Sequence, residues 1–169
     1  RPGAMNKKNL KTISPSEYTA DYYRTCCGGY EEFSLSGGRL LPIRLKKVLD
    51  YAKVKKGDIV LDIGCGRGEL LIHSMFSGAI SIGIDYSSDA VQIAASNLKE
   101  VAAQDEMKNI HISQANGERL PFRDASVDRV LMVDVVEHLL PGELYNCLRE
   151  VRRVLKGDGR LIIHTAPSL

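Results

Sequence analysis

The sequence predicts an α/β fold in which a parallel β-sheet is covered by helices on both faces. Five short apolar runs have the length and continuity of fully buried strands, and amphipathic segments with helical spacing separate them. A glycine-rich stretch joins the first of these strands to the helix that follows it. In doubly wound folds such a loop lies at the carboxyl edge of the sheet, where ligands bind.

Composition excludes several classes of protein. The 169 residues fit a single domain, and the net charge of +2 comes without a clustered basic stripe, so we expect no nucleic-acid partner. No apolar run reaches the roughly 20 residues that a membrane span requires, so we expect no transmembrane segment. The cysteines, Cys26, Cys27, Cys65 and Cys147, lack the spacing of zinc ligands. We therefore predict no metal site and a reducing, cytoplasmic location.

The sequence of the amino-terminal part predicts a helical segment that covers the ligand site as a lid. Residues 1–4 precede Met5 and are expected to be left over from cloning, so the lid segment is taken as residues 5–38. Within it, Ser14-Pro15-Ser16-Glu17 has the pattern of a capped helix start, and a looser segment is expected from Tyr30 to Gly38. The aromatic side chains of this region are Tyr18, Tyr22, Tyr23 and Tyr30.

Residues 39–169 are predicted to form the α/β core domain. The expected strands are Ile59–Ile63, Ala79–Ile84, Asn109–Gln114, Val127–Val133 and Arg160–His164, the last after a turn at Lys156-Gly157-Asp158-Gly159. The expected helices contain Leu41 to Ala52, Glu69–Phe76, the segment after the cap Ser87-Ser88-Asp89, and the stripe Leu144, Leu148, Val151 and Leu155. Right-handed crossovers between such strands give a Rossmann-like fold.

The stretch VLDIGCGRGEL (60–70) selects among adenosine-containing cofactors. Dinucleotide sites place the third glycine one residue later, and a nucleoside triphosphate site needs a Lys-Ser or Lys-Thr pair that does not follow Gly68. Asp62 would repel a pyrophosphate but attract an amine or a sulfonium. Asp85, at the end of the second strand, suits the hydroxyls of a ribose. The pattern favours a positively charged nucleoside without phosphate.

Five motifs in register resemble the class I S-adenosylmethionine-dependent methyltransferase family over residues 40–167. They are VLDIGCGRGEL (60–70), SIGIDYS (81–87), ANGERLPF (115–122), DRVLMVDVVEHL (128–139) and LREVRRVLKGDGRLII (148–163). The resemblance implies strand order 3-2-1-4-5. Family members usually carry two more strands, so we expect the carboxyl-terminal part to be truncated and the chain to belong to a longer polypeptide.

The resemblance also implies a set of cofactor-binding residues. Asp62 and the loop Gly64, Cys65, Gly66 and Gly68 would hold the methionine moiety, Asp85 the ribose, and Tyr86 or Ile84 the adenine. The family's acid–alanine pair is replaced by Asn116-Gly117, where the Asn116 amide would receive the adenine amino group without charge assistance or serve only in a turn. Asp134 completes this set. Arg39 and Arg44 are candidates for the methionine carboxylate, for an anionic acceptor, or for the surface.

The stretch from Asp134 to Leu139 is expected to face the methyl group. It lacks the [DN]-P-P-[YF] pattern, which argues against methylation of nucleobases or glutamine. His138 is the candidate general base, with an orienting role as the alternative. Glu137 is the second catalytic candidate, with a structural role at a helix start as its alternative.

These residues predict a methyltransferase that uses S-adenosylmethionine, releases S-adenosylhomocysteine and methylates a hydroxyl of a small molecule or sugar. The segment from Tyr22 to Leu45 loosely resembles methyltransferase modules of bacterial polysaccharide-assembly enzymes, which favours a glycan acceptor and polysaccharide biosynthesis. The alternatives are C- or N-methylation of a small molecule or lipid, and a non-catalytic cofactor-binding domain of a larger enzyme. A nicotinamide-dependent oxidoreductase is disfavoured by the glycine spacing.

Overall fold

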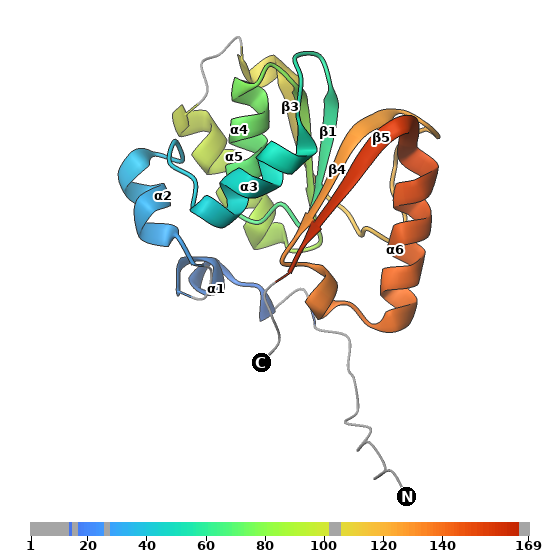
Figure 1. The fold of residues 1–169 in the computed structure, drawn as a ribbon. Helices are drawn as coiled ribbons and strands as arrows, with labels where there is room; N and C mark the ends of the chain where they lie inside the picture. Colours follow the sequence, from blue (N-terminus) through green and yellow to red (C-terminus); the bar gives the residue numbers. More distant parts are fainter. Residues whose placement is uncertain (1–13, 15–16, 26–27, 102–105, 166–169) are drawn as a thin grey trace, which may run out of the picture.

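A single parallel sheet forms the centre of the computed structural model, which describes residues 14, 17–25, 28–101 and 106–165. The strands lie in the order β3-β2-β1-β4-β5, and every neighbouring pair is parallel, as predicted (Figure 1). Their bounds are β1 Ile59–Ile63, β2 Ile80–Asp85, β3 Ile110–Gln114, β4 Val127–Val133 and β5 Leu155–His164. The predicted fold class and strand order are therefore confirmed.

Helices cover both faces of the sheet, with α3, α4 and α5 on one side and α6 on the other (Figure 1). The helices are α1 Ala20–Thr25, α2 Tyr30–Ser36, α3 Ile43–Ala52, α4 Glu69–Phe76, α5 Ser88–Val101 and α6 Pro141–Val154. Short 3-10 helices among the described residues include η2 Glu106–Asn109 and η3 Val136–His138. Each predicted core helix is present within about one turn of its expected bounds.

The two-sided burial explains why the strands read as continuous apolar runs. Val60 and Leu131 pack with the buried side chains of α3, whereas Leu61, Val130 and Met132 pack with those of α6. Because successive side chains of a strand point to opposite faces, both faces must be apolar.

The amino-terminal segment has the capping contact that was expected and differs from the prediction between Tyr30 and Gly38. The Ser14 N–H donates to Glu17 Oε1 (3.3 Å), as in a capped helix start. Helix α1 begins at Ala20, and the Thr19 hydroxyl accepts a hydrogen bond from the Tyr22 N–H (3.3 Å) at its start. The prediction of a looser segment from Tyr30 to Gly38 is wrong, because the segment contains α2. Its Phe33 is buried in the core cluster of α4 and α5, and this tertiary contact stabilises a helix too short to form alone. Predictions on residues 1–13, 15–16 and 26–27 lie outside the described residues.

The predicted turn at Lys156–Gly159 and the helical assignment of Leu155 are also wrong, because β5 already starts at Leu155. Val127 pairs with Leu155 and Arg129 with Arg160, so β5 contains an irregularity between these two pairs. The Lys156 ammonium lies 2.9 Å from both carboxylate oxygens of Asp128 on the neighbouring strand. This ion pair holds the glycine-containing segment against the sheet.

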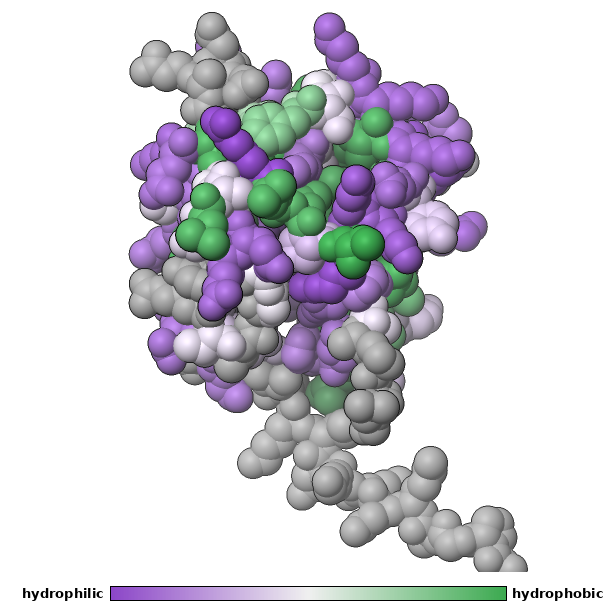
Figure 2. Space-filling model, turned by 60° about the vertical axis from the view of Figure 1, so that its left-hand side comes forward, coloured by the Kyte–Doolittle hydropathy of each residue, from purple (hydrophilic) through white to green (hydrophobic). Residues whose placement is uncertain are grey.

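The face that carries α2 and α3 is largely hydrophilic, with separate hydrophobic side chains between the polar ones (Figure 2). The large hydrophobic side chains exposed on α2, α3 and their connection are Leu35, Leu40, Ile43 and Tyr51. No helix in the described part of the chain is long and apolar enough to cross a membrane.

Candidate functional site

A cavity of about 790 Å³ opens at the carboxyl edge of the sheet, where β1, β2 and β4 end. Of the residues predicted to bind the cofactor or to catalyse, all but Gly68 and the candidate Arg39 contribute to its wall. Besides Arg44 and Ile84, they are Asp62, Gly64, Cys65, Gly66, Asp85, Tyr86, Asn116, Gly117, Asp134, Glu137 and His138. The topology thus brings together side chains that are 76 positions apart in the sequence (62 to 138).

The loop after β1 presents bare backbone to the cavity. Gly64 has φ +74°, and a Cβ atom there would lie 2.4 Å from Val135 Cγ2. The Gly64 N–H donates to the Ile84 carbonyl (2.8 Å), and the Gly66 N–H donates to Asp85 Oδ2 (3.0 Å). Only glycine fits at Gly64 without strain, because both the backbone angle and the neighbouring side chain oppose a Cβ atom.

Gly68 has a packing role instead of a place in the cavity wall. It caps the start of α4 with φ +84°, and a Cβ there would lie 3.3 Å from the Ala94 Cβ on α5. It therefore allows α4 and α5 to approach closely. Cys65 lines the cavity and is buried in the core cluster of α4 and α5, where burial raises the pKa of its thiol and favours the neutral form.

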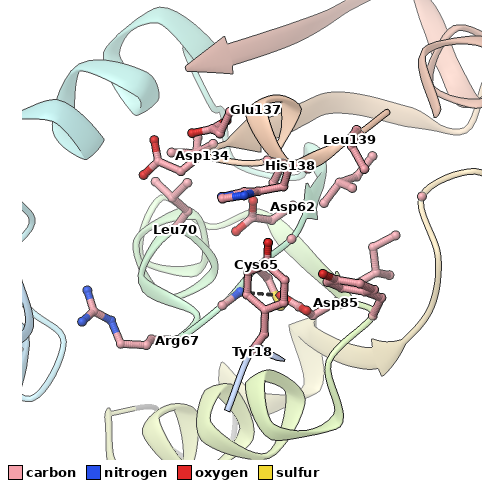
Figure 3. A pocket seen from close by; sticks show the side chains of 18 of the residues that line it. Tyr18, Asp62, Cys65, Arg67, Leu70, Asp85, Asp134, Glu137, His138 and Leu139 are labelled. Carbon is pink, nitrogen blue, oxygen red and sulfur yellow. Dashed lines mark hydrogen bonds between the residues drawn. The ribbon is translucent and has the colours of Figure 1, made fainter. Parts of the chain in front are cut away.

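Two buried carboxylates flank this loop (Figure 3). Asp62 is 3% exposed and Asp85 is 4% exposed. Burial raises the pKa of both, and the charges of Asp85 and Glu69 raise the pKa of Asp62 further, whereas hydrogen bonds from the Ser87 and Gly66 N–H groups oppose the rise at Asp85. A cation placed between them would stabilise both ionised forms.

At the carboxyl ends of β2 and β3 the cavity wall includes Ile84, Tyr86, Asn116 and Gly117. Tyr86 is half-buried and Ile84 fully buried, on the side where an adenine was predicted. The Asn116 amide oxygen accepts a hydrogen bond from the Glu118 N–H (2.8 Å), so this side chain closes a turn. Gly117 is required by packing, since a Cβ would lie 2.9 Å from the Cys147 sulfur.

The segment after β4 carries the catalytic candidates. His138 ends η3, and its ring packs edge-on against Tyr18 with centroids 5.6 Å apart. Tyr18 is buried and also contacts the rings of Tyr22 and Tyr86 at 5.0 and 5.4 Å. Burial and a hydrogen bond with Tyr86 raise the pKa of Tyr18 well above its ordinary range, which keeps it neutral. Glu137 is exposed at the mouth of the cavity.

Arg67 is a buried residue that sequence reasoning missed. Its guanidinium is paired with Glu69 (Nε to Oε1, 3.0 Å) and donates to the carbonyls of Tyr23 (3.2 Å) and Gly28 (3.1 Å). It also lies 5.3 Å from the centre of the Phe33 ring. The side chain is directed away from the centre of the cavity (Figure 3). The sequence did contain an indication of this ion pair: Arg67 lies between two glycines of the loop, and Glu69 follows it by two residues.

A second cluster joins α3 to the ends of β4 and β5; Arg44 and Asp134 were candidates from the sequence, whereas His164 and the contact among the three were not predicted. The Arg44 guanidinium contacts Asp134 Oδ2 at 2.5 Å, and His164 Nδ1 lies 3.1 Å from Asp134 Oδ1. Asp134 has φ +55°, which is rare for a residue other than glycine. All three side chains line the cavity, whereas Arg39 is exposed and does not. The sequence contained no periodic signal for this contact, because the three residues come from distant elements.

The site fits a nucleoside cofactor that carries a positive charge. Gly64 and Gly66 leave backbone that a Cβ would obstruct, and two buried acids lie on either side of that backbone. In the described part of the chain no three His, Cys, Asp or Glu side chains are gathered to hold a metal ion.

Comparison with known proteins agrees with this geometry. The family model described as "Methyltransferase domain" matches residues 61–163. The protein MJ1252 of Methanocaldococcus jannaschii is 32% identical over 142 residues, which are 81% of this chain and 50% of that protein. Demethylmenaquinone methyltransferase of Lactobacillus johnsonii is 31% identical over 69% of this chain and 47% of its own length.

The crystal structure of YcgJ from Bacillus subtilis superposes with a TM-score of 0.63 at 30% identity, covering 70% of this chain and 48% of that one. The chain therefore spans about half the length of the curated relatives it matches. The matched family segment runs from the first strand to the fifth and includes the glycine loop, both acids and His138. The chain thus belongs to the family of class I methyltransferases that use S-adenosylmethionine.

Proposed function

We propose that the protein transfers the methyl group of S-adenosylmethionine to a hydroxyl of a small acceptor, with His138 as the general base. The observation that carries the proposal is the position of His138, which lines the same cavity as the Asp62–Asp85 wall and packs against Tyr18. When bound, S-adenosylmethionine supplies a methyl group already activated by a sulfonium. The protein then has to align the acceptor, exclude water and remove a proton.

Each part of the cavity has a task in this proposal. Asp62 and the backbone of Gly64 and Gly66 hold the methionine moiety, and Asp85 holds the ribose. Tyr18 covers the site from the lid side. His138 would accept the proton of the acceptor hydroxyl as that oxygen takes the methyl group, and the Asp62–Asp85 side of the cavity would hold the nucleoside, whose sulfonium becomes a neutral thioether when the carbon–sulfur bond breaks.

The rim of the cavity supports an acceptor that has many hydroxyl groups and no phosphate. Glu118, Glu137 and Glu143 line the wall there, and carboxylates accept hydrogen bonds from sugar hydroxyls but repel phosphates. Tyr18 and Tyr22 provide aromatic surface against which a sugar or phenol ring packs. A glycan is therefore our first candidate acceptor, and nucleic acid is disfavoured.

Methylation at carbon is the second candidate. The aromatic wall of Tyr18, Tyr22 and Tyr86 would also hold a flat ring, and one relative is named for a demethylmenaquinone acceptor. In that case His138 would orient the ring. A non-catalytic cofactor-binding domain within a longer polypeptide is the third. A cytoplasmic location is proposed from cysteine usage, since Cys65 and Cys147 are free and buried.

Transfer of a labelled methyl group to a panel of sugars, phenols, quinols and amines tests the proposal. We expect label on an acceptor oxygen, located by mass spectrometry, and loss of transfer in His138→Ala. Label on carbon would replace the first candidate with the second. Binding of S-adenosylhomocysteine without methyl transfer to any acceptor would favour the third candidate, a non-catalytic cofactor-binding domain.

A further inference from the structure

We propose that His164 binds the acceptor by accepting a hydrogen bond from a second hydroxyl, next to the hydroxyl that is methylated. The acceptor is then a diol, a class that includes sugars and catechols. This inference rests on the proposed function, in which His138 meets the reacting hydroxyl, and it adds a specificity-determining residue on β5. His164 lies outside the five sequence motifs that predict the site.

Asp134 fixes the position of the proton on the His164 ring. The Nδ1 atom of His164 lies 3.1 Å from Asp134 Oδ1, and the Arg44 guanidinium contacts the other carboxylate oxygen, Oδ2. A carboxylate in an ion pair only accepts hydrogen bonds, so Nδ1 carries the ring proton in this contact. In the neutral imidazole the second nitrogen, Nε2, is then a hydrogen-bond acceptor.

The Nε2 atom of His164 is available to a ligand. His164 lines the cavity, and its side chain is 31% exposed. Within residues 14, 17–25, 28–101 and 106–165, the hydrogen bond of this ring is the one between Nδ1 and Asp134, and no group donates to Nε2. A hydrogen-bond acceptor in the wall of a binding cavity favours a ligand that brings a donor.

Contacts from two other elements hold the ring in place. The Asp134 N–H donates to the His164 carbonyl (2.9 Å), so Asp134 binds both the main chain and the side chain of His164. Arg44 ties Asp134 to α3. Asp134 has φ +55°, a conformation that persists where the surrounding contacts maintain it. A ring that is already ordered loses little conformational freedom when a ligand binds.

The strand order places His164 on the side of the cavity that the cofactor leaves open. Asp62 and Asp85, the proposed cofactor contacts, belong to β1 and β2. His164 pairs with Val133 on β4, so it lies two strands from β1, on the side away from β2. Because neighbouring strands are about 4.8 Å apart, His164 is separated from the end of β1 by about 10 Å along the edge of the sheet. The end of β4 therefore lies between the cofactor contacts and His164.

His138 and His164 together suit an acceptor with two hydroxyls. Both imidazoles line the cavity, and Asp134, which holds His164, precedes His138 by four residues. A diol can donate a hydrogen bond to each ring, whereas a mono-ol leaves one ring nitrogen without a donor. A site built to bind a hydroxyl discriminates against the analogue that lacks it. Glu137, on the same segment, also accepts hydrogen bonds and adds to this preference.

NMR of the ring nitrogens tests the contact directly. The chain has four histidines, so spectra of protein with ¹⁵N-labelled histidine are simple, and His164→Gln assigns the His164 signals. With S-adenosylhomocysteine bound, His164 should be protonated at Nδ1. Catechol and trans-cyclohexane-1,2-diol should each shift the Nε2 signal toward the protonated range, whereas phenol and cyclohexanol should not. His111, exposed on β3, is the internal control and should not respond.

Calorimetry of variants separates recognition from folding. His164→Ala should lower the affinity for both diols by about 10- to 100-fold, to the level of the mono-ols. Its affinity for S-adenosylhomocysteine should be unchanged. Asp134→Asn should reduce the preference for diols by less, since an amide oxygen still accepts the Nδ1 proton. His111→Ala is the matched control variant and should bind all the ligands as the wild type does.

Three NMR results would overturn the inference: protonation of His164 at Nε2, equal responses to diols and mono-ols, or no response to either diol. A preference for diols that persists in His164→Ala would overturn it as well. If the diols bind at His164 but receive no methyl group, the proposed function fails for these acceptors while the inference holds. Methyl transfer that is equal for diols and mono-ols and independent of His164 would support the proposed function and remove this inference.

Discussion

The Asp85 carboxylate accepts the Gly66 N–H at 3.0 Å, so the acid that ends β2 holds the loop that follows β1. Its other oxygen accepts the Ser87 N–H at 2.9 Å, just before α5 begins. One buried side chain therefore fixes the edge of the cofactor cavity on two adjacent strands. Burial raises the pKa of Asp85, so the ionised carboxylate is less stable in the native state than in the unfolded chain.

Asp85→Ala should weaken binding of S-adenosylhomocysteine by about 100-fold, because it would remove both the proposed ribose contact and the support of the Gly66 amide. Asp85→Asn should lose less affinity, since its amide oxygen can still accept one of the hydrogen bonds from the Gly66 and Ser87 N–H groups. Calorimetry measures both. Asp158→Asn, an exposed acid on β5, is the control and should bind normally. Unchanged affinity in Asp85→Ala would remove Asp85 from the cofactor site.

The stability of the protein should fall as pH rises because of Asp62. Burial and the charges of Asp85 and Glu69 raise the pKa of Asp62, so the native state binds this proton more tightly than the unfolded chain does. Between the ordinary pKa near 3.8 and the raised native value, unfolding therefore releases a proton, and the free energy of unfolding decreases with increasing pH. Asp62→Asn should flatten this slope in thermal unfolding from about pH 5 to pH 8, and at the upper end should be the more stable protein.

The same variant should bind S-adenosylmethionine more weakly, because the carboxylate for its positive charge is gone. Stability and cofactor affinity should thus change in opposite directions at Asp62. If Asp62→Asn loses both stability and cofactor affinity, or leaves both unchanged, this interpretation of the raised pKa is contradicted.

His138→Ala should lower kcat by about 100-fold or more if the side chain removes a proton in the transition state. Its affinity for S-adenosylhomocysteine should be unchanged. Glu137→Gln, one residue earlier and exposed, is the matched variant and should lower kcat less. An unchanged kcat in His138→Ala would leave this residue with an orienting role only.

Arg67→Met should be strongly destabilising, because it leaves the Glu69 carboxylate buried without its partner. Breaking a buried ion pair typically costs about 3–5 kcal/mol. Urea denaturation of Arg67→Met, Glu69→Met and the double variant would measure the coupling, and the double variant should be less destabilised than the sum of the single changes. Additive effects would mean that the 3.0 Å contact between the two side chains contributes no specific stability.

Gly64→Ala should reduce both stability and cofactor binding, since the new Cβ meets Val135 Cγ2 at 2.4 Å in a backbone of φ +74°. Adding Val135→Ala should recover part of the stability, because it removes the clash but leaves the backbone strain. Gly157→Ala is the control, as a Cβ at Gly157 has no neighbour within 4 Å. Full recovery in the double variant would show that only the clash matters.

Most of the sheet was predictable because its signal is local. The bounds of β1 match the prediction, since an apolar run between Asp58 and Gly64 has one interpretation in a two-sided sheet. The α2 segment was missed because its stability comes from Phe33 packing on distant helices. The early start of β5 was missed because Gly157 and Gly159 favour a turn, while the Lys156–Asp128 ion pair favours the sheet.

In the candidate site, too, local patterns in the sequence were predictive and contacts between distant elements were not. Spacing predicted that Asp62, Asp85 and the loop glycines lie near one another, because the carboxyl ends of parallel strands meet at one edge. Gly68 was predicted to bind the cofactor with the rest of the loop; in the structure it does not line the cavity, and it packs against Ala94. Arg44 was left with three alternative roles, since only the fold places it against Asp134.

The contacts of Arg67 have a consequence for how this domain can vary. Its guanidinium binds the main-chain carbonyls of Tyr23 and Gly28, which every amino acid possesses. Exposed side chains of the lid can therefore be exchanged without loss of these two bonds. A lid that keeps the buried Tyr18, Tyr23 and Phe33 and carries new residues at its exposed positions should dock on an unchanged core. The acceptor could then be altered by replacing one short surface segment while the cofactor site is retained.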